Sequence, residues 1–176
     1  MNFKSTSKCL LLTLLCLFSL FSQGQVAAWN NSALTGTTAG SPNASTADIN
    51  LNTPVLSRGS GIIASSLTGG YASNNWMEAS VASAITNNKF YQVSLSAKTN
   101  YKVSLSTLDF KLRRSSSGPN AYLWRYSIDG TNFTDIGSAV SFTTATTTGD
   151  VQPQLNLAGI TALQNVNNIT TITLRL

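Results

Sequence analysis

The Asp-Gly pair in "YSIDGTNFTDIG" (126–137) is the first place in this sequence where carboxylate chemistry would be sought. Asp129 and Asp135 could ligate calcium. An EF-hand loop, however, needs further acidic or amide ligands at alternate positions, a Gly at the sixth position and a Glu at the twelfth. Counting from Asp129, Thr131 and Thr134 occupy the third and sixth positions, so the pattern fails. Asp-Gly is typical of tight hairpins. We predict a turn and no metal site, with an irregular calcium site at Asp129 or Asp135 as the alternative.

Catalytic chemistry is poorly supported by the residue types present. The sequence has no His, and both cysteines, Cys9 and Cys16, lie in the amino-terminal apolar segment. Triads built on His and zinc sites built from imidazole and thiolate are therefore excluded for the exported chain. A glycosidase needs two carboxylates about 5 to 9.5 Å apart, whereas the six acidic residues fall mostly at expected turns and strand ends. We predict no enzyme and no cofactor, and we interpret Glu78, beside Trp76, as a solvated strand residue.

Aromatic, amide and guanidinium side chains in or near expected loops are the best candidates for a binding site. An aromatic ring surrounded by amide, hydroxyl and Arg groups suits a sugar, because the ring packs on its apolar face and the polar groups meet its hydroxyls. The aromatic candidates are Trp29, Tyr71, Trp76 and Tyr101, and the polar candidates are Arg58, Asn74 and Asn75. Large aromatic residues also dominate protein cores, and burial is the expected state of Trp76 and Trp124.

Arg58, in "LSRGSG", could have either of two roles. Its guanidinium could pair with a carboxylate ligand through a bidentate fork, or it could hold the domain together by donating to loop carbonyls. Gly59 and Gly61 indicate a tight backbone passage, which favours the structural role. A Gly-x-Gly pair with no following helix does not indicate a phosphate site.

The amino terminus has the features of an export signal. Lys4 and Lys8 precede an apolar run at 10–21, and small and polar residues follow. This run of 12 residues is shorter than the roughly 20 of a membrane-spanning helix and fits a cleavable signal peptide. We predict that residues 1–25 are removed. The chain would then be secreted, to the extracellular space or the cell surface, without inserting into a membrane.

The charge of the remaining chain is mild. It carries nine basic and six acidic residues, a net charge of +3. A nucleic-acid partner requires a clustered basic face, so we predict no nucleic-acid partner.

Composition and hydrophobic alternation predict an all-β chain. Charged residues are few, at 10%, and Ser, Thr, Asn and Gly are abundant, as in β-rich domains. Alternation at 91–97, 101–105 and 108–112 predicts three consecutive strands that lie next to one another as antiparallel ribbons. The segment 121–128 has no wholly polar face, which is typical of a central strand. The apolar spacing within 157–166 predicts one short helix before the last strand.

The last predicted strand, "ITTITLRL" (169–176), directs Ile172, Leu174 and Leu176 inward. Because the sequence stops there, we expect this strand to leave an unpaired sheet edge. Two alternatives stay open, a complete chain and one truncated at its carboxy terminus. In either case the pattern predicts a single domain at 26–176, an antiparallel β-sandwich of jelly-roll type.

Several strings in the sequence resemble an extracellular β-sandwich accessory module found in secreted, multidomain proteins of Bacteroidetes-like bacteria. They are "LSRGSGI", "NNW", "KFYQVSLSA", "LDFKLRRSSSGPNAY", "RYSIDGTNF" and the terminal "LQNV" and "TLRL", and together they extend from about Trp29 to Leu176. The most specific part is the combination of "RRSSSGP" with "YSIDG"; the hairpin alone also occurs in discoidin-like, galactose-binding sandwiches. The resemblance implies an accessory domain placed before nucleases, hydrolases or adhesive repeats, and it carries over no binding residues.

These features together predict a secreted, non-catalytic binding or adhesion module whose partner is a polysaccharide or another cell-surface ligand. Two alternatives stay open. The chain could be a structural spacer in a longer protein, or it could be the accessory part of an extracellular enzyme whose catalytic domain lies downstream. In both alternatives, downstream domains are further partners.

Overall fold

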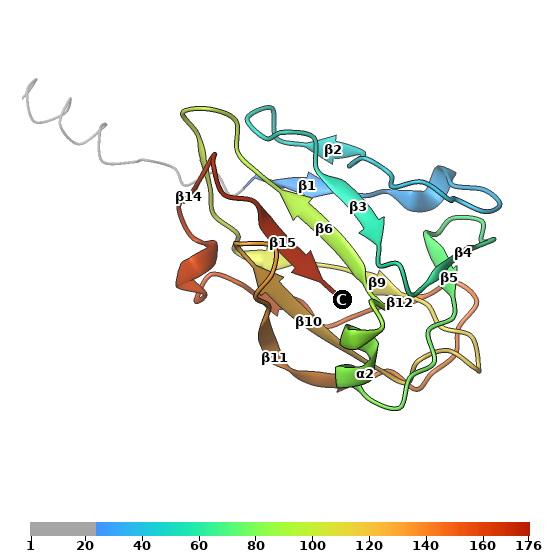
Figure 1. Cartoon of the computed structure of the whole chain (residues 1–176). Coiled ribbons are helices and arrows are strands. Elements are labelled where there is room, and N and C mark those ends of the chain that lie inside the picture. The colour runs from blue at the N-terminus through green and yellow to red at the C-terminus, as the bar shows by residue number, and fades with distance from the viewer. Residues whose placement is uncertain (1–23) are drawn as a thin grey trace, which may run out of the picture.

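A computed structural model describes residues 24–176 (Figure 1). The predicted signal peptide at 1–25 therefore lies almost entirely outside the described residues. The described chain is mostly β, and all of its strand pairs are antiparallel. The strands are β1 (Ala27–Ala28), β2 (Thr46–Ala47), β3 (Val55–Arg58), β4 (Ile63–Ser65), β5 (Ala72–Asn74), β6 (Tyr91–Leu95), β7 (Lys102–Val103), β8 (Thr107–Leu108), β9 (Lys111–Leu112), β10 (Ala121–Ser127), β11 (Thr134–Ser141), β12 (Asp150–Val151), β13 (Leu155–Asn156), β14 (Val166–Asn167) and β15 (Ile172–Arg175).

The main sheet has five strands in the order β11-β10-β15-β6-β3. The last strand, β15, therefore lies at its centre, paired with β10 on one side and β6 on the other (Figure 1). The expectation that this strand would form an unpaired edge is wrong. The physical reason is visible in its burial, because Ile172, Thr173 and Leu174 are all buried although they alternate between the two faces. The prediction that 121–128 forms a central strand is confirmed by β10.

Outside the main sheet, two irregular segments of the chain pair with each other through three pairs of short strands. β7, β8 and β9 pair in turn with β14, β13 and β12, so the segment 102–112 runs antiparallel to 150–167. The prediction that the three strands within 91–112 are neighbours is therefore wrong, since β6 belongs to the main sheet and β7 to β9 do not. Alternation revealed which side chains point inward, but it carries no information about which strand pairs with which.

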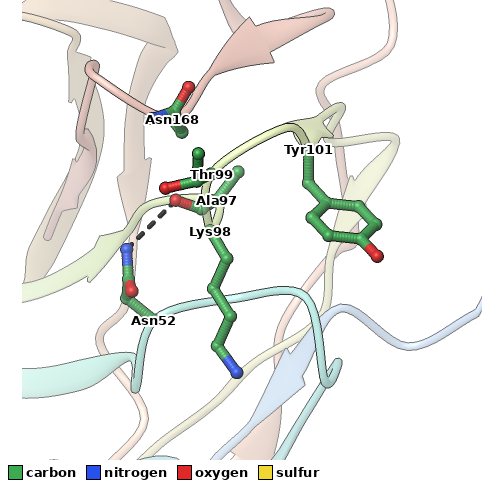
Figure 2. Close-up of a pocket in the computed structure, with 6 residues that line it drawn as sticks. All are labelled: Asn52, Ala97, Lys98, Thr99, Tyr101 and Asn168. Atoms are coloured by element: carbon green, nitrogen blue, oxygen red, sulfur yellow. Dashed lines mark hydrogen bonds between the residues drawn. The ribbon is translucent and has the colours of Figure 1, made fainter.

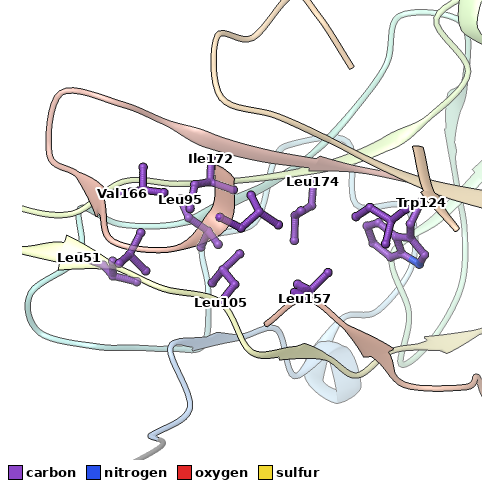
Figure 3. Packing of buried hydrophobic residues seen from close by; sticks show 11 residues of the cluster. Leu51, Leu95, Leu105, Trp124, Leu157, Val166, Ile172 and Leu174 are labelled. Carbon is purple, nitrogen blue, oxygen red and sulfur yellow. The ribbon is translucent and has the colours of Figure 1, made fainter. Parts of the chain in front are cut away.

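The hydrophobic core receives side chains from both of these parts (Figure 3). In Figure 3, Leu105 and Leu157 lie across from Leu174 of the main sheet. The predicted burial of Trp124 is confirmed, as 8% of this residue is exposed. The buried members of the core are Leu51, Leu95, Val103, Leu105, Trp124, Ile136, Leu157, Leu163, Val166, Ile172 and Leu174.

Helical structure occupies little of the described chain. The predicted helix within 157–166 is only a 3₁₀ turn, η2 (Thr161–Leu163), between β13 and β14, while its apolar residues do point into the core. The α-helix of the described part is instead α2 (Val81–Thr86), and a second 3₁₀ turn, η1, spans Asn31–Ala33. α2 begins with a Ser80–Ser83 capping box and buries no residue. Val81, Ala84 and Ile85 have the apolar spacing of a helix, but six residues are too few for that spacing to identify one. Among residues 24–176, no helix is long and apolar enough to cross a membrane.

Candidate functional site

Three of the predicted site residues, Arg58, Tyr71 and Trp76, meet at one end of the main sheet. Arg58 ends β3, and β4 and β5 lie beside it. The guanidinium carbon of Arg58 lies 3.6 Å from the centroid of the Tyr71 ring. Tyr91, which the sequence reasoning did not select, joins them, because its ring is 4.9 Å from that of Trp76 and 5.4 Å from that of Tyr71, centroid to centroid. We call these four residues the Arg58 cluster.

The polar atoms of the Arg58 cluster bond mainly to β5 and the residues beside it. Arg58 donates from Nε to Ser73 Oγ at 2.6 Å and from Nη2 to the Ala72 carbonyl at 2.8 Å. The Tyr91 hydroxyl donates to the Tyr71 carbonyl and contacts Ser73 Oγ. Burial raises the pKa of both tyrosines, although nearby Arg58 partly opposes this increase. These contacts attach β5 to the main sheet, which is the structural role favoured for Arg58.

The backbone next to Arg58 confirms the predicted tight passage. A Cβ atom added to Gly59 would lie 2.0 Å from the carbonyl oxygen of Asn88, and one added to Gly61 would lie 1.9 Å from that of Asn87. Side chains other than hydrogen are therefore excluded at both positions. The close approach places the 59–61 loop directly against the segment that follows α2, and hydrogen bonds from Gly59 to Phe90 and from Gly61 to Asn88 hold it there.

The remaining candidates near β5 contribute their polar groups locally. Asn74 is exposed at the end of β5, and Asn75 adopts a positive φ of 68° while its Nδ2 donates to the Gly61 carbonyl. Trp76 is only partly buried, contrary to the expected burial, and its Nε1 donates to the Ser73 carbonyl. Glu78 is not the solvated strand residue that we expected. It follows β5 outside any strand, and it forms a 2.9 Å ion pair with Lys89 in which its side chain is 17% exposed.

Trp29 and Tyr101 lie apart from the Arg58 cluster. Trp29 packs against the core and donates from Nε1 to the Pro42 carbonyl at 3.1 Å. Tyr101, by contrast, is 48% exposed and follows the turn after β6. Of the predicted aromatic candidates, Tyr101 therefore offers the most accessible ring.

Tyr101 lines an open hollow of about 480 Å³ (Figure 2). The hollow gathers amide, hydroxyl and ammonium groups from segments far apart in the sequence. Its lining consists of Asn52, Ala97, Lys98, Thr99, Tyr101 and Asn168. Sequence reasoning found only Tyr101 of this set, because the amides of Asn52 and Asn168 reach the hollow through the fold and not through a local motif. We call this site the Tyr101 hollow.

Hydrogen bonds hold several of the residues that line the Tyr101 hollow in place. Asn52 donates from Nδ2 to the Ala97 carbonyl, shown dashed in Figure 2, and to Ser96 Oγ. The ammonium of Lys98 donates to the Ile49 carbonyl at 2.8 Å, which leaves further N–H donors, since an ammonium carries three. The turn itself is closed by a bond from the Tyr101 amide to the Lys98 carbonyl. The Tyr101 ring is therefore carried by a hydrogen-bonded turn, and the ammonium of Lys98 in the same turn keeps N–H donors for a ligand.

The candidate calcium ligands lie in and beside the hairpin between β10 and β11. Asp129 Oδ1 accepts from the amides of Thr131 and Asn132, and its Oδ2 accepts from Asn132 Nδ2. These bonds hold the pKa of Asp129 well below its usual range, with the Asn132 side chain contributing most. Gly130 has a φ of 77°, as the predicted turn requires. Asp135 is in β11 and pairs with Arg125, its Oδ1 lying 2.6 Å from Arg125 Nε.

The acidic side chains of the described residues do not come together in a cluster that would suit a metal ion. Within residues 24–176, no group of three or more His, Cys, Asp or Glu side chains is placed to hold a metal ion. Both oxygens of Asp129 already accept hydrogen bonds from the turn. The turn predicted at Asp129-Gly130 is confirmed by the antiparallel pairing of β10 with β11 and by the positive φ of Gly130.

Comparison of the chain with protein-family models, with curated proteins and with solved structures finds no match. The resemblance to an extracellular accessory module accordingly rests on the short sequence strings alone. The part of it that holds is the coarse one, a mostly β chain with antiparallel sheets.

Proposed function

We propose that this protein is a secreted, non-catalytic module that binds neutral glycans at the Tyr101 hollow. The observation that carries the proposal is the exposed Tyr101 ring on a hollow whose lining also includes the amides of Asn52 and Asn168 and the hydroxyl of Thr99. A Tyr ring offers an apolar face on which a sugar ring can pack, together with a polar tip. Amide and hydroxyl groups can donate to and accept from sugar hydroxyls. The open shape of the hollow suits one part of a long chain better than an enclosed small molecule.

The proposed architecture is a β-sandwich of jelly-roll type. One layer is the five-stranded main sheet, and the other consists of the paired segments 102–112 and 150–167. Support comes from the core, which takes buried side chains from both parts. In such a sandwich, the turns at the ends of the strands are the surfaces free to bind ligands, and the Tyr101 hollow is built from turns.

The proposed absence of catalysis is supported by the local engagement of the carboxylates. Glu78 pairs with Lys89, Asp135 pairs with Arg125, and Asp109 Oδ1 accepts from Gln154 Nε2. A general acid or base must reach the substrate proton to act, and these groups are held by neighbours instead. The second candidate function, an accessory part of a longer extracellular enzyme, predicts the same inactivity for this chain. A measured turnover that is lost in Glu78→Gln or Asp109→Asn would contradict both.

The experiment that tests the proposal is retention of the purified protein on an array of polysaccharides, compared among three forms. The unmodified protein should be retained on at least one neutral glycan. Tyr101→Ala should weaken binding to that glycan about tenfold, as expected for losing one aromatic contact. Ile63→Ala removes another exposed apolar side chain, in β4, and should bind normally. Equal binding by Tyr101→Ala and the unmodified protein, or no retention on any glycan, would overturn the proposal.

A further inference from the structure

The face of the main sheet that points away from the core carries a row of polar side chains in register. Strand pairing places Asp135, Arg125, Arg175, Gln92 and Ser57 side by side across β11, β10, β15, β6 and β3. These residues alternate with those that enter the core, so their side chains leave the sheet on its other face. With neighbouring strands about 4.8 Å apart, the row is roughly 19 Å long. We call it the outer row.

Arg175, in the middle of the outer row, forms no ion pair with any residue of the described range 24–176. Its Nε and Nη2 both donate to Gln92 Oε1, at 3.2 and 2.7 Å. Its guanidinium carbon lies 3.7 Å from the ring centroid of Phe90 and 3.7 Å from that of Phe133. The two rings hold the guanidinium in place by cation–π contact. Its Nη1 makes no hydrogen bond with the described residues and is not sealed from solvent.

Arg125 brings a second guanidinium directly beside the first. It is the cross-strand partner of Arg175, and its Nε and Nη2 donate to Asp135 Oδ1 and to the Phe133 carbonyl. Like charges directly opposite each other in a sheet destabilise it. The outer row thus sets two guanidinium groups against one carboxylate, and that carboxylate lies on the edge strand β11, where its side chain is 52% exposed. A further anion placed at Arg175 would relieve the repulsion.

We propose that the outer row binds the carboxylates of an acidic polysaccharide, a chain of uronic acid units, through Arg175 and Arg125. In both guanidinium groups Nε and Nη2 already donate to neighbouring protein atoms, so each would offer its Nη1 donors to a ligand carboxylate, in a charge-assisted hydrogen bond. Gln92 and Ser57 extend the row with amide and hydroxyl groups that suit sugar hydroxyls. The charge complementarity and the length of the row both fit a linear acidic chain. This site shares no residue with the Tyr101 hollow and stands whether or not the hollow binds glycans.

Calorimetric titration of the purified protein with an oligogalacturonate tests this proposal. The acidic oligomer should bind, more weakly at high salt, and its fully methyl-esterified form, which keeps the rings but lacks the charges, should not. Arg175→Gln should weaken binding about tenfold or more, because it removes a hydrogen bond between charged groups. Lys102→Gln removes the same charge from β7 and should leave the affinity within about twofold, as expected for a remote, screened charge.

Asp135→Asn is a second variant that does not disturb the stacked Arg175. Removing the internal carboxylate frees Arg125 for the ligand, so binding should tighten severalfold. The proposal is overturned if the acidic oligomer does not bind, if the ester binds equally well, or if Arg175→Gln and Lys102→Gln weaken binding equally. It is also overturned if Asp135→Asn leaves binding unchanged, or if an oligoglutamate peptide binds more tightly than the oligomer. Tyr101→Ala should bind the acidic oligomer normally, which separates this test from that of the hollow.

Discussion

At the scale of single residues, side-chain type alone did not distinguish the aromatic rings that pack within the fold from the ring that is exposed to solvent. Tyr71, Trp76 and Tyr101 were all candidates in the sequence, although burial was expected for Trp76. In the structure, the first two stack within the Arg58 cluster, whereas Tyr101 is half exposed. The difference arises from long-range contacts, since Tyr91 and Arg58 supply the partners of Tyr71. Residue types therefore predicted a set that contains the accessible ring but could not identify it.

Asp129 offers a prediction at this scale. The turn amides and Asn132 hold its pKa below the ordinary value, which is about 3.9. A lowered folded-state pKa means that the stabilising contribution is complete above the unfolded pKa and is lost as the pH falls through the lower range. Asp129→Ala should therefore lower the urea midpoint of unfolding at pH 6, and the difference from the unmodified protein should shrink as the pH falls below about 4. Urea titrations at several pH values measure this difference.

The matching control is Asp150→Ala, whose carboxylate accepts no hydrogen bond from residues 24–176 and which should have a much smaller effect at pH 6. A difference between Asp129→Ala and the unmodified protein that stays constant from pH 6 to pH 2 would show that the carboxylate charge is not what holds the turn together.

At the scale of elements, the sequence predicted strands and turns well where the signal is local. The β10–β11 hairpin and the central position of β10 followed from Asp129-Gly130 and from a strand with no polar face. The helix was misplaced, because the inward spacing of Leu157, Leu163 and Val166 is also produced by two short strands joined by a 3₁₀ turn. α2 was not predicted because its six residues are too few to show a helical period. It depends on its cap and on the ion pair and hydrogen bonds around it, which apolar periodicity does not report.

The edge strand β11 contains a register shift that the alternation of apolar and polar residues does not predict. Its pairing with β10 shifts register between Tyr122 and Trp124, where β11 carries extra residues and Gly137 has a φ of 73°. Bulges and charged residues blunt a free sheet edge against pairing with other chains. β11 therefore combines an irregular backbone with the charge of Asp135 at one open edge of the main sheet.

Gly59 gives the prediction at this scale. A methyl group there would lie 2.0 Å from the Asn88 carbonyl oxygen and 2.8 Å from the Phe90 ring, so Gly59→Ala must displace backbone. We expect a loss of about 2 to 4 kcal/mol in the free energy of unfolding, at the upper end of single substitutions. Gly159→Ala is the control, because no atom lies within 4 Å of its added Cβ; it should change stability by no more than about 0.5 kcal/mol. Equal stability of the two variants would contradict the close approach.

At the scale of the whole molecule, the sequence predicted a mostly β chain with antiparallel sheets but not its topology. Alternation correctly placed Val93, Leu95, Ile172 and Leu174 on the core side. It could not reveal that β15 enters between β10 and β6, since strand partners are decided by contacts across some 80 residues of chain, as in the pairing of Arg175 with Gln92. Thr173, whose side chain leaves β15 on the face opposite to Ile172 and Leu174, is buried as well, as expected for a central strand.

The topology predicts the pattern of amide hydrogen exchange. Amides in central strands exchange mainly through global unfolding, while those at edges exchange through local opening. The β15 amides should therefore be among the most protected of the protein, and those of β11 that face away from β10 should exchange much faster. Exchange of the β15 amides at the rate of the open β11 edge, measured by NMR, would contradict the central placement of the last strand.

The claim on which the functional account depends is that ligand binds at the Tyr101 hollow. Chemical-shift mapping by NMR tests it most directly, using the neutral glycan that the array retains. The account predicts shifts concentrated at Asn52, Lys98, Thr99, Tyr101 and Asn168, with the Arg58 cluster unaffected. Shifts concentrated instead at Arg58, Tyr71 and Trp76, with Tyr101 and its neighbours unchanged, would contradict it.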